Sequence, residues 1–388
     1  MNYHALRRQT LARTLKALDK DLEGALITSP VNVSYLTGFT GEASYLVVTP
    51  KSSVLVSDSR FEVQIREECP EVGKAGELEL HIRPHMRTVE DATAEVIGKM
   101  GLKNVSVEGS RISVAELETL KSFSSKAVFV PRSGVVESLR AVKDMGEIEK
   151  IREAVRVAER AFKMFTATLA PTDTEKEMVD ALDGFLRRAG ARGASFPTIV
   201  GAGERGALPH APPTNRRLEE SSKLLIDWGA DMVYKSDITR VIRSPFVTTP
   251  TRKNKHERTA YSLDEVYEIV LDAQNAALAE IRPGAKCVDV DAAARKVITN
   301  AKLKNDPKLK LGDCFHHGLG HGIGLEIHES PRVRANSDDV LEAGMVITIE
   351  PGIYIPGWGG VRIEDDILVT RDGYTMLTTL PRDLPPKG

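Results

Sequence analysis

Five side chains whose types could hold metal ions occur in surroundings where ionisable groups are rare. Asp227 lies in the apolar run LLIDWG, and Asp237 follows it in YKSDITRVI. Glu350 and Glu364 lie in MVITIEPG and GVRIED, and His321 lies among glycines in HHGLGHGIGLEIHE. A carboxylate in an apolar strand is costly unless it is paired or bound to a metal. Any one of these residues alone could be a core acid with satisfied hydrogen bonds or the cap of a strand.

The five residues together favour a metal centre over that simpler interpretation. Four carboxylates that converge without a cation repel each other and raise each other's pKa. Two divalent cations about 3.5–4 Å apart would remove this penalty and lower the pKa of a shared water. Oxygen ligands with a single imidazole and no thiolate favour manganese, cobalt, iron or zinc over a structural zinc site. We therefore expect two divalent metal ions. The ligand types do not decide among these four metals, of which manganese is taken as the first choice.

The bulk composition limits the class of protein and the compartment. A chain of 388 residues with 41% hydrophobic residues suits a soluble protein of two domains. Its 53 basic and 55 acidic residues give a net charge of −2, which offers no electrostatic case for nucleic acid or a membrane as partner. Three widely separated cysteines argue against disulfides and fit a reducing compartment. With no secretory signal or membrane-spanning apolar run in view, we expect a cytoplasmic location.

The elements that must position these residues form two groups along the chain. Residues 1–140 alternate helix and strand signals and predict a small α/β domain. Its strand-like runs are GALIT, YLVVT, SVLVS, LELHIR, VSVEG and AVFVP, and its helices are expected over 3–20, 60–69, 88–100 and 113–123. Weak periodicity over 133–146 indicates the boundary, after which an apolar stripe predicts a long helix.

Residues 141–388 have the pattern of an α+β domain. A second helix is expected to begin at the capping pattern Thr172-x-x-Glu175 and to stop before Gly190. The strand-like runs are SFPTIV, KLLIDWG, YKSDITRVI, MVITIEPGIYI and VRIEDDILV. Two helices interrupt them, over 262–281 with a cap at Ser262-x-x-Glu265 and over 288–301. The basic loop 249–261 is interpreted as a solvated insertion.

The segment GAGERG at 201–206 matches the glycine pattern of dinucleotide-binding folds. That fold requires a helix to begin at the glycines. Here the chain continues as ALPHAPP, whose prolines oppose a helix, so tight turns between strands explain the glycines better.

Five motifs in a fixed order carry a family resemblance: LPHAPP, DWGADMVYKSDITR, HHGLGHGIGLEIHESP, TIEPGIY and GVRIEDD. With NVSYLTGFTGEASYLVVT and SDSRFEVQ before them, they resemble the creatinase/aminopeptidase P/prolidase family of metallopeptidases over nearly the whole chain. The resemblance implies an α+β pita-bread domain over 141–388, preceded by a smaller creatinase-like α/β domain over 1–140. It also implies a dimer or larger oligomer.

The resemblance implies roles for individual residues. Metal ligands would be Asp227, Asp237, His321, Glu350 and Glu364. Asp237 and Glu364 would bridge both metals, Glu350 would also act as general base, and Arg362 would orient the acidic ligands. The matching catalytic histidines are His210, His317 and His328. We expect His328 to stabilise the oxyanion, His210 to contact the carbonyl or the leaving nitrogen, and His317 to orient the substrate.

The sequence departs from the family pattern at the hairpin between the two aspartates. The spacing from Asp227 to Asp237 is one residue shorter than usual, and the segment GADMVYK lacks its common glycine. A one-residue change reverses the side-chain direction within a regular strand. A shorter turn could absorb the change; otherwise Asp237 would point away from the site. The loop 249–261 is also longer than usual in the family.

The expected activity is that of an Xaa-Pro aminopeptidase, an exopeptidase acting on peptides with proline in the second position. A pocket can select proline by shape because its imide nitrogen has no N–H and its ring is rigid. The alternative is an Xaa-Pro dipeptidase (prolidase). A metal-free peptide-binding scaffold of the same fold, a creatinase-like hydrolase and a methionine aminopeptidase are weaker alternatives, because the ligand types and the long N-terminal domain argue against them.

Overall fold

A computed structural model describes residues 2–74, 77–124, 126–246 and 261–384. The chain divides into two compact units, Met1–Arg140 and Ala141–Gly388. Most of the candidate chemistry predicted from the sequence falls in the second unit. The basic loop 249–261 lies outside the described residues apart from Tyr261.

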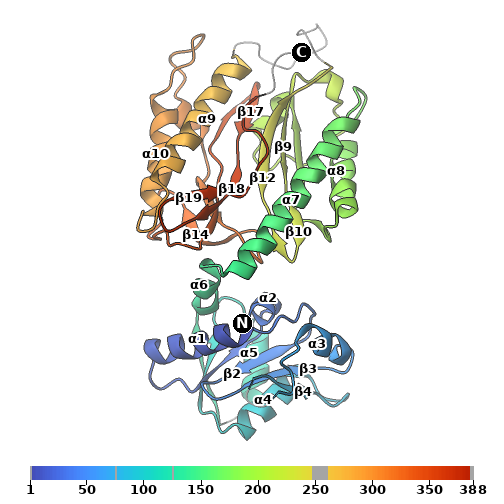
Figure 1. The fold of residues 1–388 in the computed structure, drawn as a ribbon, viewed down its shortest axis with the longest axis vertical. Coiled ribbons are helices and arrows are strands. Elements are labelled where there is room, and N and C mark those ends of the chain that lie inside the picture. The colour runs from blue at the N-terminus through green and yellow to red at the C-terminus, as the bar shows by residue number, and fades with distance from the viewer. Residues whose placement is uncertain (1, 75–76, 125, 247–260, 385–388) are drawn as a thin grey trace. The chain divides into compact units, whose positions relative to one another are not determined.

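The N-terminal unit is a six-stranded mixed sheet with helices packed on it (Figure 1). The strands lie in the order β4-β3-β2-β1-β5-β6, with β1 antiparallel to β2 and parallel to β5. They are β1 (Gly24–Ile27), β2 (Tyr45–Val48), β3 (Ser53–Ser57), β4 (Glu79–Ile82), β5 (Asn104–Glu108) and β6 (Val128–Arg132). The helices are α1 (Tyr3–Leu18), α2 (Pro30–Thr37), α3 (Glu62–Glu68), α4 (Val89–Lys99), α5 (Val114–Phe123) and α6 (Val135–Ala141).

Helix α2 was not expected from the sequence, because eight residues are too short to display a periodic stripe. Pro30 opens this helix, and Gly38 ends it in the left-handed conformation at φ 88°. Helix α6 was not expected either, because residues 133–146 were interpreted as a weakly periodic boundary. The remaining elements of this unit agree with the expected alternation of helix and strand. The small α/β domain predicted from the sequence is therefore confirmed.

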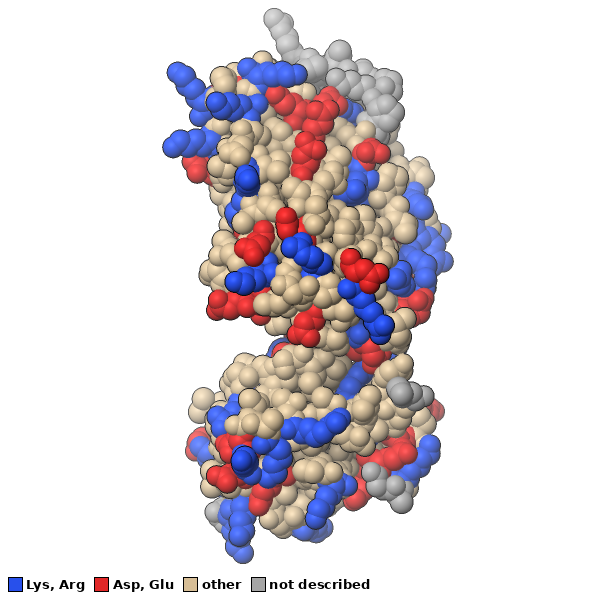
Figure 2. Space-filling view, turned by 60° about the vertical axis from the view of Figure 1, so that its left-hand side comes forward, with Lys and Arg blue, Asp and Glu red and all other residues tan. Residues whose placement is uncertain are grey.

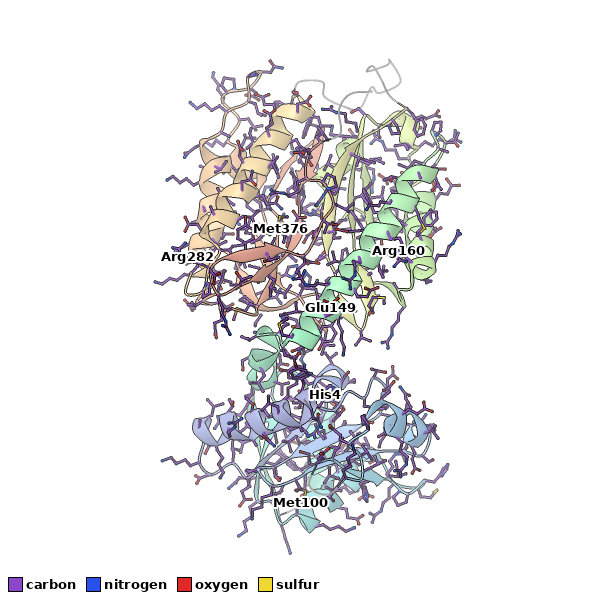
Figure 3. All side chains as sticks on the ribbon, viewed as in Figure 1. His4, Met100, Glu149, Arg160, Arg282 and Met376 are labelled. Atoms are coloured by element: carbon purple, nitrogen blue, oxygen red, sulfur yellow. The ribbon has the colours of Figure 1, made fainter. Side chains whose placement is uncertain are left out.

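Two helix pairs flank the strands of the C-terminal unit (Figure 1). One pair is α7 (Met145–Thr168) and α8 (Glu175–Ala189), and the other is α9 (Leu263–Glu280) and α10 (Cys287–Asn300). Glu149 and Arg160 mark α7 in Figure 3, where side chains fill the space between helices and strands. The predicted apolar stripe of α7 is buried along its length, at Ile148, Ile151, Val155, Ala158 and Phe162.

The strands of this unit form several small antiparallel sheets. One sheet has the order β12-β9-β8, with β8 (Ile199–Ala202), β9 (Lys223–Trp228) and β12 (Ile238–Arg243). A five-stranded sheet has the order β14-β13-β15-β18-β19, with β13 (Gly320–Gly322), β14 (Glu329–Val333), β15 (Val346–Ile349), β18 (Asp365–Val369) and β19 (Tyr374–Met376). Shorter pairings involve β7 (Gly193–Ala194), β10 (Ala230–Met232), β11 (Tyr234–Lys235), β16 (Gly352–Ile355) and β17 (Gly359–Arg362).

The alternation of β9 explains how an acid and a tryptophan can be neighbours in one buried strand. Trp228 packs against α7, where its ring stacks on Phe162 at 4.2 Å between centroids and its Nε1 donates to the Ala158 carbonyl at 3.0 Å. Successive strand residues point to opposite faces. Asp227 is therefore directed to the other side of the sheet, away from the helix.

The predicted caps of two helices are wrong in detail. Helix α8 is capped by Thr174 and Glu177, whose side chains and backbone amides bond reciprocally, and not by Thr172 and Glu175. This shift leaves Glu175 free to turn inward, where it is fully buried. In α9, Ser262 occupies the cap position without a side-chain hydrogen bond. Its expected partner Glu265 instead accepts a hydrogen bond from the Lys304 amide at 2.8 Å.

The glycines of GAGERG serve close packing and not a dinucleotide site. The segment leaves β8 and forms a short 3₁₀ helix, Gly203–Ala207, instead of opening an α-helix. A Cβ atom on Gly201 would lie 2.9 Å from the Cα of Gly206. Glycine is required because the two backbone segments touch.

The visible surface in Figure 2 carries acidic and basic side chains interspersed, in keeping with a net charge of −2. Among the described residues, no helix is long and apolar enough to cross a membrane.

Candidate metal centre and peptide pocket

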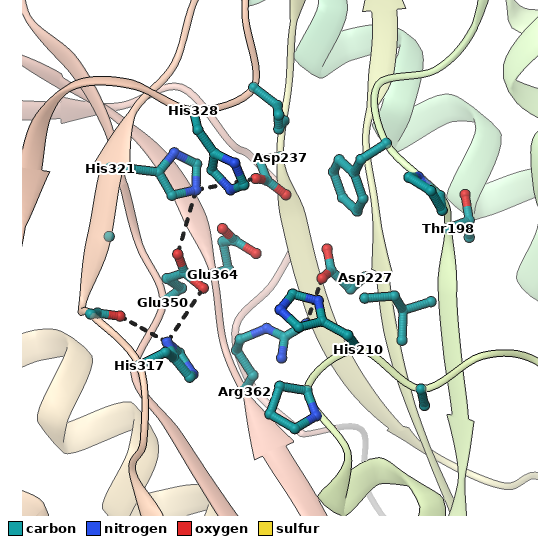
Figure 4. A pocket seen from close by; sticks show the side chains of 18 of the residues that line it. Thr198, His210, Asp227, Asp237, His317, His321, His328, Glu350, Arg362 and Glu364 are labelled. Atoms are coloured by element: carbon teal, nitrogen blue, oxygen red, sulfur yellow. Dashed lines mark hydrogen bonds and ion pairs between the residues drawn. The ribbon is translucent and has the colours of Figure 1, made fainter.

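A pocket of about 690 Å³ in the C-terminal unit contains every site residue predicted from the sequence. Figure 4 shows Asp227, His210 and Thr198 on the right of the view, with His317, His321 and Glu350 on the left. The predicted residues that line it are His210, Asp227, Asp237, His317, His321, His328, Glu350, Arg362 and Glu364. The structure thus brings together side chains from five separate sequence motifs.

The two aspartates enter the pocket from neighbouring antiparallel strands. Asp227 lies in β9 opposite Thr239 of β12, and Asp237 precedes Thr239 by two residues. Residues two apart on a strand share a face, so both carboxylates point to the same side. The shortened spacing therefore leaves Asp237 in place.

The missing residue is absorbed in the tight hairpin between β10 and β11. Met232 pairs directly with Tyr234, and Val233 alone turns the chain. Val233 adopts φ 87°, a left-handed conformation that is strained for a β-branched side chain. The glycine that the family commonly has in this hairpin would relieve that strain.

His321 lies close to three of the four acids. Its Nε2 is 3.6 Å from Asp237 Oδ2 and 3.5 Å from Glu350 Oε1. Potential ligand atoms of Asp237, His321 and Glu364 all lie within 4.8 Å of one another. His321 Nδ1 lies 3.1 Å from the Gly322 carbonyl oxygen, which can only accept. This contact favours a proton on Nδ1 and directs the lone pair of Nε2 at the acids.

Burial raises the pKa of all four carboxyl groups, because the charged forms lose their water. Neighbouring acids add to this effect at Asp237, Glu350 and Glu364, and together with burial they raise the pKa of Glu364 to about 8. Burial also lowers the pKa of His321 to about 3, so its imidazole is neutral at neutral pH. Four acids and a neutral imidazole are a suitable donor set for divalent cations, which would reverse the penalty.

Arg362 and Thr239 hold the acids in position. The Arg362 guanidinium donates to Asp227 Oδ2, and its Nε donates to the Thr239 hydroxyl at 3.0 Å. Thr239 in turn donates to Glu364 Oε2 at 2.6 Å. Asp227 Oδ1 is buried and has no hydrogen-bond partner in the part of the chain described. The free oxygen of an otherwise anchored carboxylate fits a metal ligand.

Two of these supporting residues were missed in the sequence. Thr239 lies in the quoted motif SDITR, two residues after Asp237, and the strand alternation could have revealed it. Tyr354 lies in TIEPGIY, four residues after Glu350. Its hydroxyl accepts from Arg362 Nη1 at 2.8 Å and lies 2.8 Å from His317 Nε2. Tyr354 thus links Arg362 to one of the predicted histidines.

The three predicted histidines have different surroundings. The His328 ring meets His321 edge to face at 4.4 Å between centroids. His317 has both ring nitrogens in contact with polar groups, Nε2 with Tyr354 and Nδ1 with the Gly318 carbonyl at 2.8 Å. Its Nδ1 is also 3.9 Å from Glu350 Oε2. His210 is exposed, and its ring makes no hydrogen bond within the described ranges.

The rest of the pocket has an apolar wall and two cations. Its apolar lining includes Phe196, Pro197, Ile199, Pro209, Ala211, Pro212, Pro213 and Ile327. Arg332 and Arg334 also line it, from the end of β14. Neither arginine was singled out in the sequence, although both follow the histidine motif closely, in the segment PRVR.

Comparison with known proteins decides the family. The profile of metallopeptidase family M24 matches residues 149–371, and that of the creatinase/prolidase N-terminal domain matches residues 7–142. The chain belongs to metallopeptidase family M24. The resemblance seen in the sequence is confirmed, as is the pita-bread C-terminal domain preceded by a creatinase-like domain. Membership of a metallopeptidase family also supports divalent metal ions as cofactors.

Similar M24 proteins cover almost the whole chain. An Xaa-Pro dipeptidase of Pyrococcus furiosus is 33% identical over 97% of this chain and 99% of its own. The solved structure of an Xaa-Pro dipeptidase from Bacillus anthracis has 35% identity and a TM-score of 0.84, covering 98% and 99% of the two chains. An X-Pro aminopeptidase from Thermotoga maritima has 31% identity and a TM-score of 0.80, covering 94% and 99%.

Proposed function

We propose that this M24 metallopeptidase is an Xaa-Pro dipeptidase. The observation that carries the proposal is Arg332, whose half-buried side chain lines the pocket on the strand next to His321. In the described residues, its guanidinium has no carboxylate partner. Its positive charge contributes to lowering the pKa of His321 and His328, so it lies close to the metal centre. A guanidinium there suits the free C-terminal carboxylate of a dipeptide.

This proposal reverses the order of preference drawn from the sequence. The sequence alone placed the aminopeptidase first, because nothing in the motifs limited the length of the substrate. Dipeptidase names predominate among the named relatives reported above, and Arg332 gives that preference a physical basis. The aminopeptidase remains the second candidate, supported by the Thermotoga relative.

The proposed metal ligands are the five residues of the acidic cluster. Asp227, Asp237, His321, Glu350 and Glu364 would hold two divalent ions, manganese first, with Asp237 and Glu364 shared between them. When bound, such ions polarise the peptide carbonyl and activate water. Arg362 and Thr239 keep Asp227 and Glu364 oriented toward the ions through the hydrogen bonds described above.

The remaining residues would bind the substrate and move protons. Glu350 would accept the proton of the attacking water and pass it to the leaving nitrogen. His328 would donate to the carbonyl oxygen as charge develops on it, and His210 would contact the leaving group from the opposite side. His317, held by Tyr354, would orient the substrate.

The apolar wall supports selection of proline. Phe196, Pro197 and Ile199 line the pocket beside the proline-rich segment that carries His210. These side chains offer a rigid surface without hydrogen-bond donors, which a proline ring can fill without leaving an N–H unpaired. An ordinary residue in that position would bury its amide N–H at a cost.

The test is hydrolysis of Ala-Pro, Ala-Pro-NH₂ and Ala-Ala by the purified protein supplied with Mn²⁺. We expect kcat/KM for Ala-Pro to exceed that for either comparison peptide by at least about tenfold, because only Ala-Pro offers both the ring and the free carboxylate. Arg332→Ala should abolish the difference between Ala-Pro and its amide. Arg371→Ala, a change at an exposed arginine outside the pocket, is the matched control.

Equal rates on the acid and the amide would contradict the dipeptidase and favour the aminopeptidase. Failure to bind Mn²⁺ or to cleave any proline peptide would favour a binding scaffold.

A further inference from the structure

Arg334 lines the pocket close to Arg332. The proposed dipeptidase activity uses Arg332 but gives Arg334 no role. Arg334 lies two residues after Arg332 and one residue beyond the end of β14 at Val333. Both line the pocket. Arg332 is half-buried and Arg334 is exposed. Arg332 is therefore the inner cation of the pocket, and Arg334 is the outer cation, closer to solvent.

The register of β13 and β14 places the two arginines against different parts of the site. Arg332 pairs with His321, and Val333 pairs with Gly320. One residue further, a Cβ atom on Gly318 would lie only 3.0 Å from the Cβ of Arg334. Arg334 therefore emerges beside Gly318 and its neighbour His317, no more than about 7 Å from Arg332 along the chain.

This arrangement fits peptides of two lengths. Each residue added to an extended peptide moves its C-terminal carboxylate by about 3.3–3.6 Å. The long side chain of arginine can span the remaining distance to a carboxylate one residue beyond a dipeptide. Arg334 has no side-chain ion pair among the residues described, so its guanidinium is available to an anionic ligand.

We propose that Arg334 is a second carboxylate-binding residue, which holds the C-terminal carboxylate of Xaa-Pro-Xaa tripeptides. The inference rests on the proposed function, in which Arg332 holds the carboxylate of the dipeptide. It names a wider substrate class for the same site: dipeptides anchored at the inner arginine and tripeptides anchored at the outer one. Gly318 is part of the arrangement, because it leaves room for the Arg334 side chain to pass.

The kinetic test compares Ala-Pro with Ala-Pro-Leu in the Mn²⁺-loaded protein. Wild type should cleave both peptides. Arg334→Ala should raise KM for Ala-Pro-Leu about tenfold, the effect of losing one charge-assisted hydrogen bond, and change KM for Ala-Pro less than twofold. Arg334→Lys should restore part of the loss because the charge remains. Equal effects on the two peptides, or no effect on either, would overturn the inference.

A binding test needs no hydrolysis. Calorimetric titration measures the affinity for three ligands. Pro-Leu is the product of Ala-Pro-Leu and carries the C-terminal carboxylate, Pro-Leu-NH₂ lacks that carboxylate, and free proline is the product of Ala-Pro. Wild type should bind Pro-Leu about tenfold more tightly than the amide, and Arg334→Ala should lose that preference while proline binding stays unchanged. Equal affinity of wild type for Pro-Leu and its amide would refute the outer site.

The outcomes separate this inference from the proposed function. A wild-type protein that cleaves Ala-Pro but neither cleaves Ala-Pro-Leu nor prefers Pro-Leu to its amide is a strict dipeptidase, and Arg334 then has no substrate role. A protein that prefers Ala-Pro-Leu and ignores Ala-Pro would retain the outer site while contradicting the inner one.

Discussion

Two of the pocket's histidines, His210 and His317, lie on loops that are each held by a buried carboxylate and an arginine. One loop, residues 203–214, carries His210. The other, residues 315–319, carries His317. In each case the carboxylate belongs to the second helix of a flanking pair, α8 or α10. The backbones of both loops are thus held by the same kind of contact, but the two histidine rings have different surroundings.

Glu175 anchors the first loop from the start of α8. Its carboxylate accepts from the Ala202 amide at 2.9 Å, from Arg205 Nε at 2.8 Å, and from the amide and hydroxyl of Thr214 at 2.9 and 2.6 Å. Arg205 also donates to the Pro212 carbonyl. One buried carboxylate therefore ties both ends of the segment together.

Asp291 anchors the second loop from α10. It accepts from Arg295 Nε at 2.6 Å and from the Leu319 amide at 3.1 Å. Arg295 donates to the carbonyls of Phe315 and His317 and lies over the Phe315 ring at 4.3 Å. The loop is thus held on both sides of His317.

The difference lies in the rings. His317 is fixed at both nitrogens, and burial, with the positive charge of Arg362, lowers its pKa to about 3. The ring of His210 has no such partner within the described ranges. A fixed neutral histidine suits a constant task such as orienting substrate, whereas an unpartnered ring on a fixed loop can turn to meet the substrate.

The largest expected effect comes from removing the carboxylates that hold the two loops. Glu175→Ala leaves the Arg205 guanidinium and two backbone amides without their acceptor, so it should lower the free energy of unfolding by about 3–5 kcal/mol. Asp291→Ala should cost about the same or slightly less, since it frees one amide. Urea denaturation of both variants provides the measurement, with Glu149→Ala, at an exposed glutamate of α7, as the control. Losses below about 1 kcal/mol would show that the loops do not depend on these carboxylates.

The next largest effect distinguishes the catalytic contributions of the His317 and His210 rings. His317→Ala and His210→Ala should each lower kcat/KM by about 10²-fold. Tyr354→Phe should lower it in wild type but have a smaller effect in the His317→Ala background, because the hydroxyl acts partly through that ring. The losses of transition-state stabilisation caused by Tyr354→Phe and His210→Ala should be additive, because no hydrogen bond links these two side chains in the part of the molecule that the structure describes. A double-mutant cycle measures this difference, and equal coupling to both histidines would remove the contrast.

A pH effect follows from the low pKa of His317. Between its unfolded value of about 6.5 and its folded value of about 3, the unfolded chain binds a proton that the folded chain excludes. The contribution of His317 to the free energy of unfolding is complete above pH 6.5. It is lost as the pH falls toward 3, by no more than about 1.4 kcal/mol per pH unit. His317→Asn should flatten the fall in unfolding free energy between pH 6 and 4. An unchanged slope would mean that His317 is already protonated there.

The smallest effect concerns the hairpin between the two aspartates, which carries neither histidine. Val233→Gly should stabilise the protein by about 1 kcal/mol, because glycine tolerates the left-handed backbone that valine does not. Thermal melts of this variant and of Met232→Gly, at a position without positive φ, would show the effect. Destabilisation by Val233→Gly would mean that valine contributes packing that outweighs its strain.

The sequence was informative where a residue had to be of one type. The acids in apolar strands and the glycine-flanked His321 could be found because burying them without a purpose is costly. The apolar stripe of α7 could be read from its period. These signals are local, so one sequence suffices to see them.

What the sequence did not reveal depends on contacts between distant segments. Glu175 was interpreted as half of a capping box, because nothing nearby in the chain indicates that Arg205 and Thr214 surround it. The role of Tyr354 became visible only once the strands were paired. The strands β13 and β14 were also missed, because the glycine-rich run around His321 hides their alternation.

The buried acids of the pocket are proposed to hold two divalent cations. Calorimetric titration of Mn²⁺ into exhaustively chelated protein, with Ala-Pro hydrolysis followed in the same samples, tests this claim most directly. We expect two ions bound per chain, activity restored as they bind, and fewer ions with negligible activity in a folded Glu364→Gln variant. Full activity after chelation, or no Mn²⁺ binding by the wild-type chain, would contradict the claim.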